Sequence, residues 1–136
     1  MGAWGSGIFE NDAAMDFIGN LADHPENADS VLREALETAA HMGGYLDAPE
    51  GEEALAAAAI ISLAADGSPV QPEPSVEDYA RKISRKVPSG LAPLAIEAID
   101  RVLADESELR ELWEEQDAVA EWRAEPDAVR HHLETL

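Results

Sequence analysis

The chain has 136 residues, 46% of them hydrophobic, which suffices for one hydrophobic core and is too short for two comfortable domains. It contains no cysteine, which excludes disulfides, thiolate metal ligands and cysteine nucleophiles and fits a reducing cytoplasm. Twenty-nine acidic residues against nine basic ones give a net charge of −20, so a surface for nucleic acid or for anionic membranes is disfavoured.

The negative charge leaves two interpretations open. The acidic field would attract a basic protein, polyamines or divalent cations, or it serves only to keep the protein in solution. The longest apolar run, Ala54–Ala65, is too short for a membrane-spanning helix, and the N-terminus lacks the basic region of a signal peptide. We therefore expect a cytoplasmic protein without membrane contact, and the pattern does not predict an oligomeric state.

Residues 1–10 predict an irregular arm. Glycines at alternate positions, Gly5 and Gly7 among them, weaken both helix and strand. Trp4 and Phe9 are too large and apolar to remain in water. We therefore expect the arm to lie across the helices with these side chains buried.

The same opening follows the pattern M-G-A-W-G-x-G-x-F-x-N-D-x-A-x-D. The residues that carry it are Met1, Gly2, Ala3, Trp4, Gly5, Gly7, Phe9, Asn11, Asp12, Ala14 and Asp16. This pattern resembles the opening of DUF4259, a family of small bacterial proteins known as a domain of unknown function. The resemblance implies a small, bacterial, cytoplasmic protein and brings with it no catalytic residue.

Three interpretations apply to the arm. In the first, glycine-flanked amides bind an anion next to a helix N-terminus, although the spacing fits neither a dinucleotide loop nor a P-loop. In the second, which we favour, the glycines let the chain bend so that Trp4 and Phe9 dock on the helices. In the third, a ligand pocket lies under the arm near Trp4. The candidate interaction residues of this region are Trp4, Gly5, Gly7, Asn11, Asp12 and Asp16.

Two apolar stripes at helical spacing follow the arm. The first helix begins after a cap at Asn11 or Asp12 and ends before His24, and the second opens near Asp29 and stops at Gly43. Their stripes are Ala14, Phe17, Ile18 and Leu21 in the first helix, and Leu32, Ala35, Leu36 and Ala39 in the second.

Residues 23–34, between these stripes, have part of the spacing of a calcium loop. The third position is a proline and Ala28 replaces the required glycine, so we favour helix capping over calcium binding. A third helix starts around Pro49 or Glu50 and runs to Gly67. Because its second half is apolar on nearly every side, it is predicted to be central.

Residues 67–75 are rich in proline and predict an internal linker. Ser75 then caps a fourth helix whose basic stripe consists of Arg81, Lys82, Arg85 and Lys86. This stripe is either a site for an anion or an acidic partner or, as we favour, a set of ion pairs with acids of a neighbouring helix. A fifth helix follows over 91–103.

The last third of the chain predicts two further helices. Asp105 or Ser107 caps a sixth helix whose apolar stripe runs on to Ala120. The final helix begins at Pro126, and Trp122 is expected to pack on it.

Chemically reactive patterns are weak. The histidines are His24, His41, His131 and His132, and none forms a helical metal pair. His132 lies on an apolar stripe, where a hydrogen-bonded structural histidine is the usual outcome. Glu37 and His41 share a helix face and would suit an acid/base or two-ligand pair, but such pairs arise by chance in so acidic a chain. We therefore predict no cofactor and no metal site, and enzyme activity is unsupported.

These patterns together predict an all-α single domain over residues 1–136, with six to seven short helices around Ala54–Leu63. The leading functional hypothesis is a small acidic module that binds a basic protein. An immunity-type protein that neutralises a basic toxin is its most concrete form, by analogy alone. The alternatives are an enzyme or divalent-metal binder that uses Glu/His pairs, and a helical bundle that binds a small ligand near Trp4.

Overall fold

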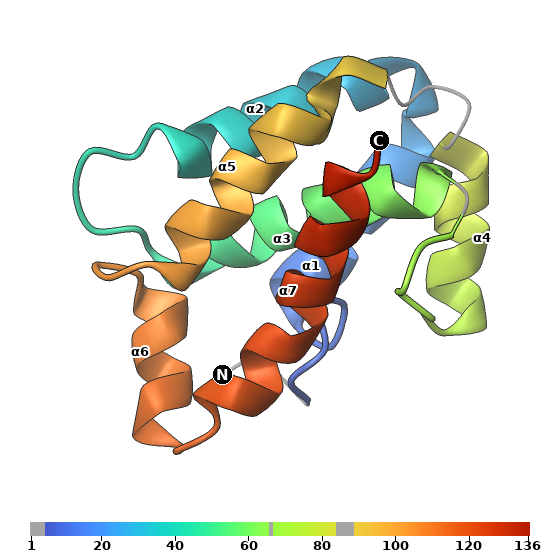
Figure 1. Cartoon of the computed structure of the whole chain (residues 1–136). Helices are drawn as coiled ribbons and strands as arrows, with labels where there is room; N and C mark the ends of the chain where they lie inside the picture. The colour runs from blue at the N-terminus through green and yellow to red at the C-terminus, as the bar shows by residue number, and fades with distance from the viewer. Residues whose placement is uncertain (1–4, 66, 84–88) are drawn as a thin grey trace.

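The helix α3 (Ala48–Ala64) lies at the centre of the molecule (Figure 1). The computed structural model describes residues 5–65, 67–83 and 89–136, and within these ranges every other α-helix contacts α3. The remaining elements are α1 (Asp12–Asp23), the 3₁₀ turn η1 (Pro25–Asn27), α2 (Ala28–Ala40), α4 (Pro74–Ile83), the 3₁₀ turn η3 (Ser89–Leu91), α5 (Ala92–Leu103), α6 (Glu108–Glu115) and α7 (Val119–Glu134). The described residues contain no strand, so the fold is the predicted all-α single domain, here with seven packed helices.

Alanine explains why α3 can be central. Every residue from Ala54 to Ser62 is buried, and most of them are alanines, whose small side chains let helices approach from all sides. In Figure 1, α7 crosses α3 while α4 lies near its C-terminal end. The predicted central segment is thereby confirmed.

The first helix follows its sequence signals closely. The Asn11 side chain is the N-cap of α1, and its Oδ1 accepts a hydrogen bond of 2.8 Å from the backbone N–H of Ala14. The predicted stripe is buried throughout: Ala14, Phe17, Ile18 and Leu21. The second helix starts at Ala28, directly after η1, and ends at Ala40, before the predicted stop at Gly43.

The start of α4 differs from the prediction. The helix begins at Pro74, so Ser75 lies inside its first turn and is not the cap. The backbone N–H of Glu77 donates to the carbonyl oxygen of Glu73 at 3.0 Å, which places the cap position at Glu73. The reason is the fixed φ of proline, which suits the first helical position, where no N–H donor is needed.

The predicted start of the last helix at Pro126 is wrong. The break falls earlier, where Asp117 adopts a left-handed φ of 55° and α6 ends at Glu115. Pro126 lies inside α7 and is buried. Because proline has no backbone N–H, the helix lacks one hydrogen bond, the one to the Trp122 carbonyl. Trp122 is therefore part of the last helix and does not pack on it from outside.

Three of the proposed interaction residues, Trp4, Arg85 and Lys86, lie outside the described residues. None of the helices in the described ranges has the length and apolar character needed to cross a lipid bilayer.

Candidate functional site: a pocket beneath the N-terminal arm

The described part of the arm is irregular and is held by hydrogen bonds to α7 and to the cap of α1. The backbone N–H of Ile8 donates to Oε1 of Glu125 on α7 at 2.9 Å. Ile8 and Phe9 are buried, as expected for an arm that docks on the helices. Asn11 uses both ends of its amide, because Nδ2 donates to the Ile8 carbonyl at 3.1 Å while Oδ1 caps α1. The arm is thus held between the first and last helices.

The glycines at positions 5 and 7 make room for one of the chain's own carboxylates. A Cβ at Gly5 would lie 2.5 Å from Glu10 Oε2, and a Cβ at Gly7 would lie 2.6 Å from Glu10 Oε1. The backbone N–H of Gly7 donates to Glu10 Oε1 at 3.0 Å. The amide that the anion hypothesis needs is therefore already bound to Glu10.

A pocket of about 130 Å³ lies beneath this arm. Its lining comes from the arm (Gly5, Ser6, Gly7, Ile8 and Asn11), from α3 (Ala48, Pro49, Glu52 and Leu55), from α6 (Leu109, Leu112 and Trp113) and from α7 (Trp122). Segments from the beginning, middle and end of the chain thus meet at one apolar pocket. Concave apolar sites with few polar groups are the usual form of a small-molecule site.

Among the described residues of this lining, Glu52 is the one ionisable side chain. Burial and the nearby charges of Asp12, Glu108 and Glu53 raise its pKa to about 6. Within the described residues, no hydrogen bond reaches its carboxyl group. A carboxyl with a perturbed pKa inside an apolar pocket marks a candidate binding site on physical grounds.

The walls of the pocket are joined by backbone contacts between distant segments. Leu46 and Ser107 form an isolated parallel bridge, with hydrogen bonds of 2.8 Å from Leu46 N to Glu106 O and 2.9 Å from Glu108 N to Leu46 O. The Glu108 carboxylate then accepts from the backbone N–H of Ala48 at 2.7 Å, at the start of α3. An acid at a helix N-terminus complements the helix dipole, and here it also fixes α6 relative to α3.

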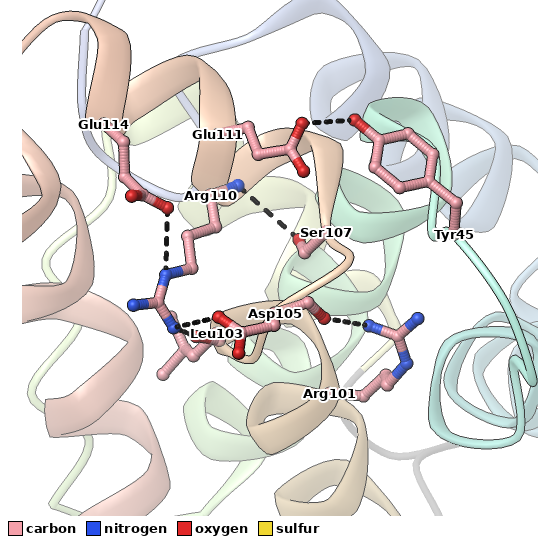
Figure 2. A network of polar contacts seen from close by, with 8 residues as sticks. All are labelled: Tyr45, Arg101, Leu103, Asp105, Ser107, Arg110, Glu111 and Glu114. Carbon is pink, nitrogen blue, oxygen red and sulfur yellow. Dashed lines mark hydrogen bonds and ion pairs between the residues drawn. The ribbon is translucent and has the colours of Figure 1, made fainter.

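Polar contacts also fix α6 to the end of α5 and to the loop that precedes α3, as Figure 2 shows. Arg110 of α6 donates to the Leu103 carbonyl at 2.8 Å and to Glu114 at 3.2 Å. Tyr45 donates its hydroxyl to Glu111 at 2.9 Å, and this bond, with the surrounding acids, raises the pKa of Tyr45 to about 12. These contacts orient the face of α6 that carries the pocket residues.

Arg101 ties the loop before α3 to the corner between α5 and α6. Its guanidinium donates to the backbone carbonyls of Met42, Gly44, Asp105 and Glu106. One side chain therefore holds both loops that meet at the bridge.

The basic stripe of α4 is described only in part. Arg81 pairs with Glu77 at 3.2 Å and with Asp78 at 3.4 Å, both in its own helix. Both contacts lie within one turn of the same helix, where local helix geometry makes them available. The favoured pairing of the stripe with acids of a neighbouring helix stays a prediction, because Arg85 and Lys86 lie outside the described residues. The ammonium of Lys82 lies 5.9 Å from the centre of the Tyr79 ring.

Two histidine predictions have different outcomes. His132 is buried, and its Nδ1 lies 2.7 Å from the hydroxyl of Ser62, which is fully buried and also 2.8 Å from the Ser68 hydroxyl. This is the expected hydrogen-bonded structural histidine. His41 lies just past the end of α2, where it is exposed like Glu37. Among the described residues, no group of three or more metal-ligating side chains comes together.

A second concave feature, the acidic groove, lies between α1, α2 and the start of α3. Its carboxylates are Asp16, Glu34, Glu50 and Glu53, and its floor includes Phe17, Val31 and Ala35. One oxygen of Glu50, Oε2, is buried without a hydrogen-bond partner among the described residues. Burial and the charge of Glu50 raise the pKa of Glu53. In the part of the chain that the structure describes, no basic residue lines this groove.

Most of the lining residues of the pocket were missed by sequence reasoning. Of the proposed interaction residues, Gly5, Gly7 and Asn11 line it, Asp12 acts on it through its charge, and Asp16 lies in the acidic groove. Glu52 reads in the sequence as one of several acids in the first turns of a helix. The one available signal was the pair of tryptophans near the end of the chain, whose convergence depends on the turn at Asp117.

The geometry defines a small all-α domain whose irregular N-terminal arm covers an apolar pocket, with Glu52 as the ionisable group among its described lining residues. The chain belongs to the family described as a domain of unknown function, DUF4259, whose model matches residues 2–125. This match confirms the resemblance of the opening residues and extends it over most of the chain. No curated protein and no solved structure matches the chain.

Proposed function

We propose that this domain binds a small, largely apolar ligand in the pocket beneath the N-terminal arm. The observation that carries the proposal is the convergence of two tryptophans, Trp113 and Trp122, with leucines of α3 and α6 around a pocket of about 130 Å³. A dry apolar cavity of about 150 Å³ holds a benzene-sized molecule, so the ligand is expected to contain about six to ten non-hydrogen atoms.

Binding is tested with a panel of ring compounds, both neutral ones and amines, by thermal shift and by tryptophan fluorescence. Trp113 and Trp122 line the pocket, so a ligand should change the fluorescence as well as raise the melting temperature. Ala48→Leu places extra volume in the lining and should abolish both responses. Ala124→Leu is the matched control, because Ala124 is exposed on α7.

Two results would reject the proposal. One is the absence of any response across the whole panel, and the other is unchanged binding by Ala48→Leu. If Ala48→Leu proves unstable, Leu112→Ala is used instead. This change enlarges the lining and should shift the preference toward larger rings.

The acidic groove favours a second candidate function, binding of a basic protein partner. Within the described ranges, its four carboxylates (Asp16, Glu34, Glu50 and Glu53) share the groove with no basic residue, and Glu50 Oε2 is buried without a hydrogen-bond partner. A lysine or arginine side chain of a partner would supply the missing donor. An immunity-type protein that neutralises a basic toxin is the most concrete version of this candidate, and a cytoplasmic location fits a chain without cysteine.

A defined lysine- and arginine-rich peptide tests this second candidate by calorimetry at low and high salt. The groove variant Asp16→Asn/Glu34→Gln/Glu53→Gln should bind the peptide more weakly than a control variant with three exposed acids neutralised outside the groove, Glu97→Gln/Glu115→Gln/Glu121→Gln. Equal weakening by both variants would point to the net charge alone and would remove the groove from consideration.

A further inference from the structure

We propose that the ligand of the pocket is a small amine, and that its protonated amino group pairs with the carboxylate of Glu52. This inference rests on the proposed function and adds the chemical class of the ligand. The pocket supplies apolar walls for a ring or a short aliphatic body, and Glu52 supplies one negative charge among them.

The charge distribution around Glu52 is the first argument. Among the described residues, the charged groups that act on its carboxyl group are all acidic: Asp12 from α1, Glu53 from α3 and Glu108 from α6. The described part of the arm and α7 contribute no ionisable side chain to the lining. Within the described residues, no base of the protein compensates Glu52, so a cationic ligand is electrostatically complementary where an anionic one is repelled.

The aromatic lining is the second argument. Trp113 and Trp122 line the same pocket as Glu52. Indole rings attract cations through their negative faces and also pack well against apolar groups. A carboxylate together with indole rings therefore favours a ligand with an ammonium group on an apolar body.

The protonation of Glu52 should make the affinity for an amine depend on pH. With a pKa of about 6, the carboxyl group is largely ionised at neutral pH and about nine-tenths protonated near pH 5. A small primary amine stays protonated over this range. Its affinity should therefore fall about tenfold between about pH 7.5 and about pH 5, whereas a neutral analogue should bind almost equally well at both.

Calorimetric titration with three probes that share a benzyl group tests the inference: benzylamine, benzyl alcohol and toluene. Benzylamine should bind wild-type protein about tenfold more tightly than benzyl alcohol at about pH 7.5. Glu52→Gln should remove this preference and leave benzyl alcohol unchanged, while Glu52→Asp should keep part of it. Glu34→Gln is the matched control, since Glu34 lines the acidic groove and not the pocket and is not among the charges that raise the pKa of Glu52.

The outcomes separate the inference from the proposed function. Binding of all three probes with equal affinity, or an unchanged preference for benzylamine in Glu52→Gln, would overturn the amine inference while the pocket remains a ligand site. Tighter binding of benzyl alcohol near pH 5 would also overturn it, because the protonated carboxyl would then act as a donor. Binding of no probe at all would overturn both.

Discussion

Asn11 joins the arm to the first helix through two hydrogen bonds, one to the Ile8 carbonyl and one from the Ala14 amide. Asn11→Ala removes both and leaves buried backbone groups without partners. We expect a loss of about 1–2 kcal/mol in the free energy of unfolding. Chemical denaturation measures it, with Asn20→Ala, at an exposed position of the same helix, as the control. Equal effects of the two changes would contradict the role of Asn11.

Glu52 links the pocket to the pH dependence of stability. Its pKa is raised to about 6 in the folded protein, so the folded state holds the proton more tightly than the unfolded chain. The contribution of this group to stability is therefore greatest below the pKa of the unfolded state, about 4.5, and is lost as the pH rises through about 6.

Glu52→Gln should accordingly stabilise the protein only where the carboxyl would be charged. We expect a gain of about 1 kcal/mol at about pH 7.5, reduced from the full value of the pKa change because the side chain is only half-buried, and almost none near pH 4. Denaturant titrations of both proteins at the two pH values measure this difference. A loss of stability of similar size at both pH values would mean that Glu52 stabilises the fold through its contacts.

Sequence reasoning worked for residues whose partners are near in the chain. The caps at Asn11 and Ser107 bond to amides three residues further on, and such spacing is visible in the sequence. The cap of α3 was not visible, because Glu108 reaches Ala48 from another helix. Glu52 was missed for the same reason, since its environment comes from α1 and α6 as well as from its own helix.

Replacing Gly51 or Gly67 by alanine is expected to change the stability of the protein in opposite directions. Gly51 lies inside α3, and a Cβ there would meet Leu109 and Val102 at 3.6 Å, an ordinary contact distance. Gly51→Ala should therefore stabilise the protein by about 0.5–1 kcal/mol through helix propensity. Gly67 follows α3 with a φ of +86°, where alanine is strained, so Gly67→Ala should destabilise it.

Thermal and chemical denaturation of the two glycine variants provide the measurement. Gly51→Ala should raise the midpoint and Gly67→Ala should lower it. A destabilised Gly51→Ala protein would show that α3 and α6 pack too closely for an added methyl group.

The sequence predicts that the helices exist, but it does not predict where α4 and α7 begin. Apolar stripes at a spacing of three and four residues identify α1, α2 and α5, because burial of one face selects that spacing. Proline is the reason that the starts of α4 and α7 were mispredicted. Pro74 begins a helix one residue before the serine that resembles a cap, and Pro126 lies within a helix that it was expected to begin.

The whole molecule carries a net charge of −20, and many of its arginines pair with acids in their own helix. Such pairs leave the repulsion between helices largely uncompensated. Raising sodium chloride from about 0.02 M to about 0.5 M should therefore raise the melting temperature by several degrees, because salt screens exposed charges.

A charge-reduced protein provides the control for this salt effect. Glu97→Gln/Glu115→Gln/Glu121→Gln removes three exposed acids on three different helices and should respond less to salt. A melting temperature that falls as salt rises would show that the ion pairs outweigh the repulsion.

The fold class could be predicted because it depends on composition and periodicity, which are properties of each segment alone. The pocket could not, because it depends on how four segments meet. Ser6, Glu52, Trp113 and Trp122 line one pocket although they span most of the chain. The sequence supports a pocket near the arm only as one of several hypotheses.

The hydrogen bond between Ile8 and Glu125 has a consequence for the order in which the protein matures on the ribosome. The N-terminal arm, which covers the pocket, is synthesised first, but the Glu125 carboxylate that accepts its hydrogen bond belongs to α7. Until α7 has left the exit tunnel, the arm lacks this anchor and the pocket lacks the Trp122 wall. Ligand affinity should therefore appear only after α7 has emerged from the tunnel, and a nascent chain stalled before residue 119 would not yet have it.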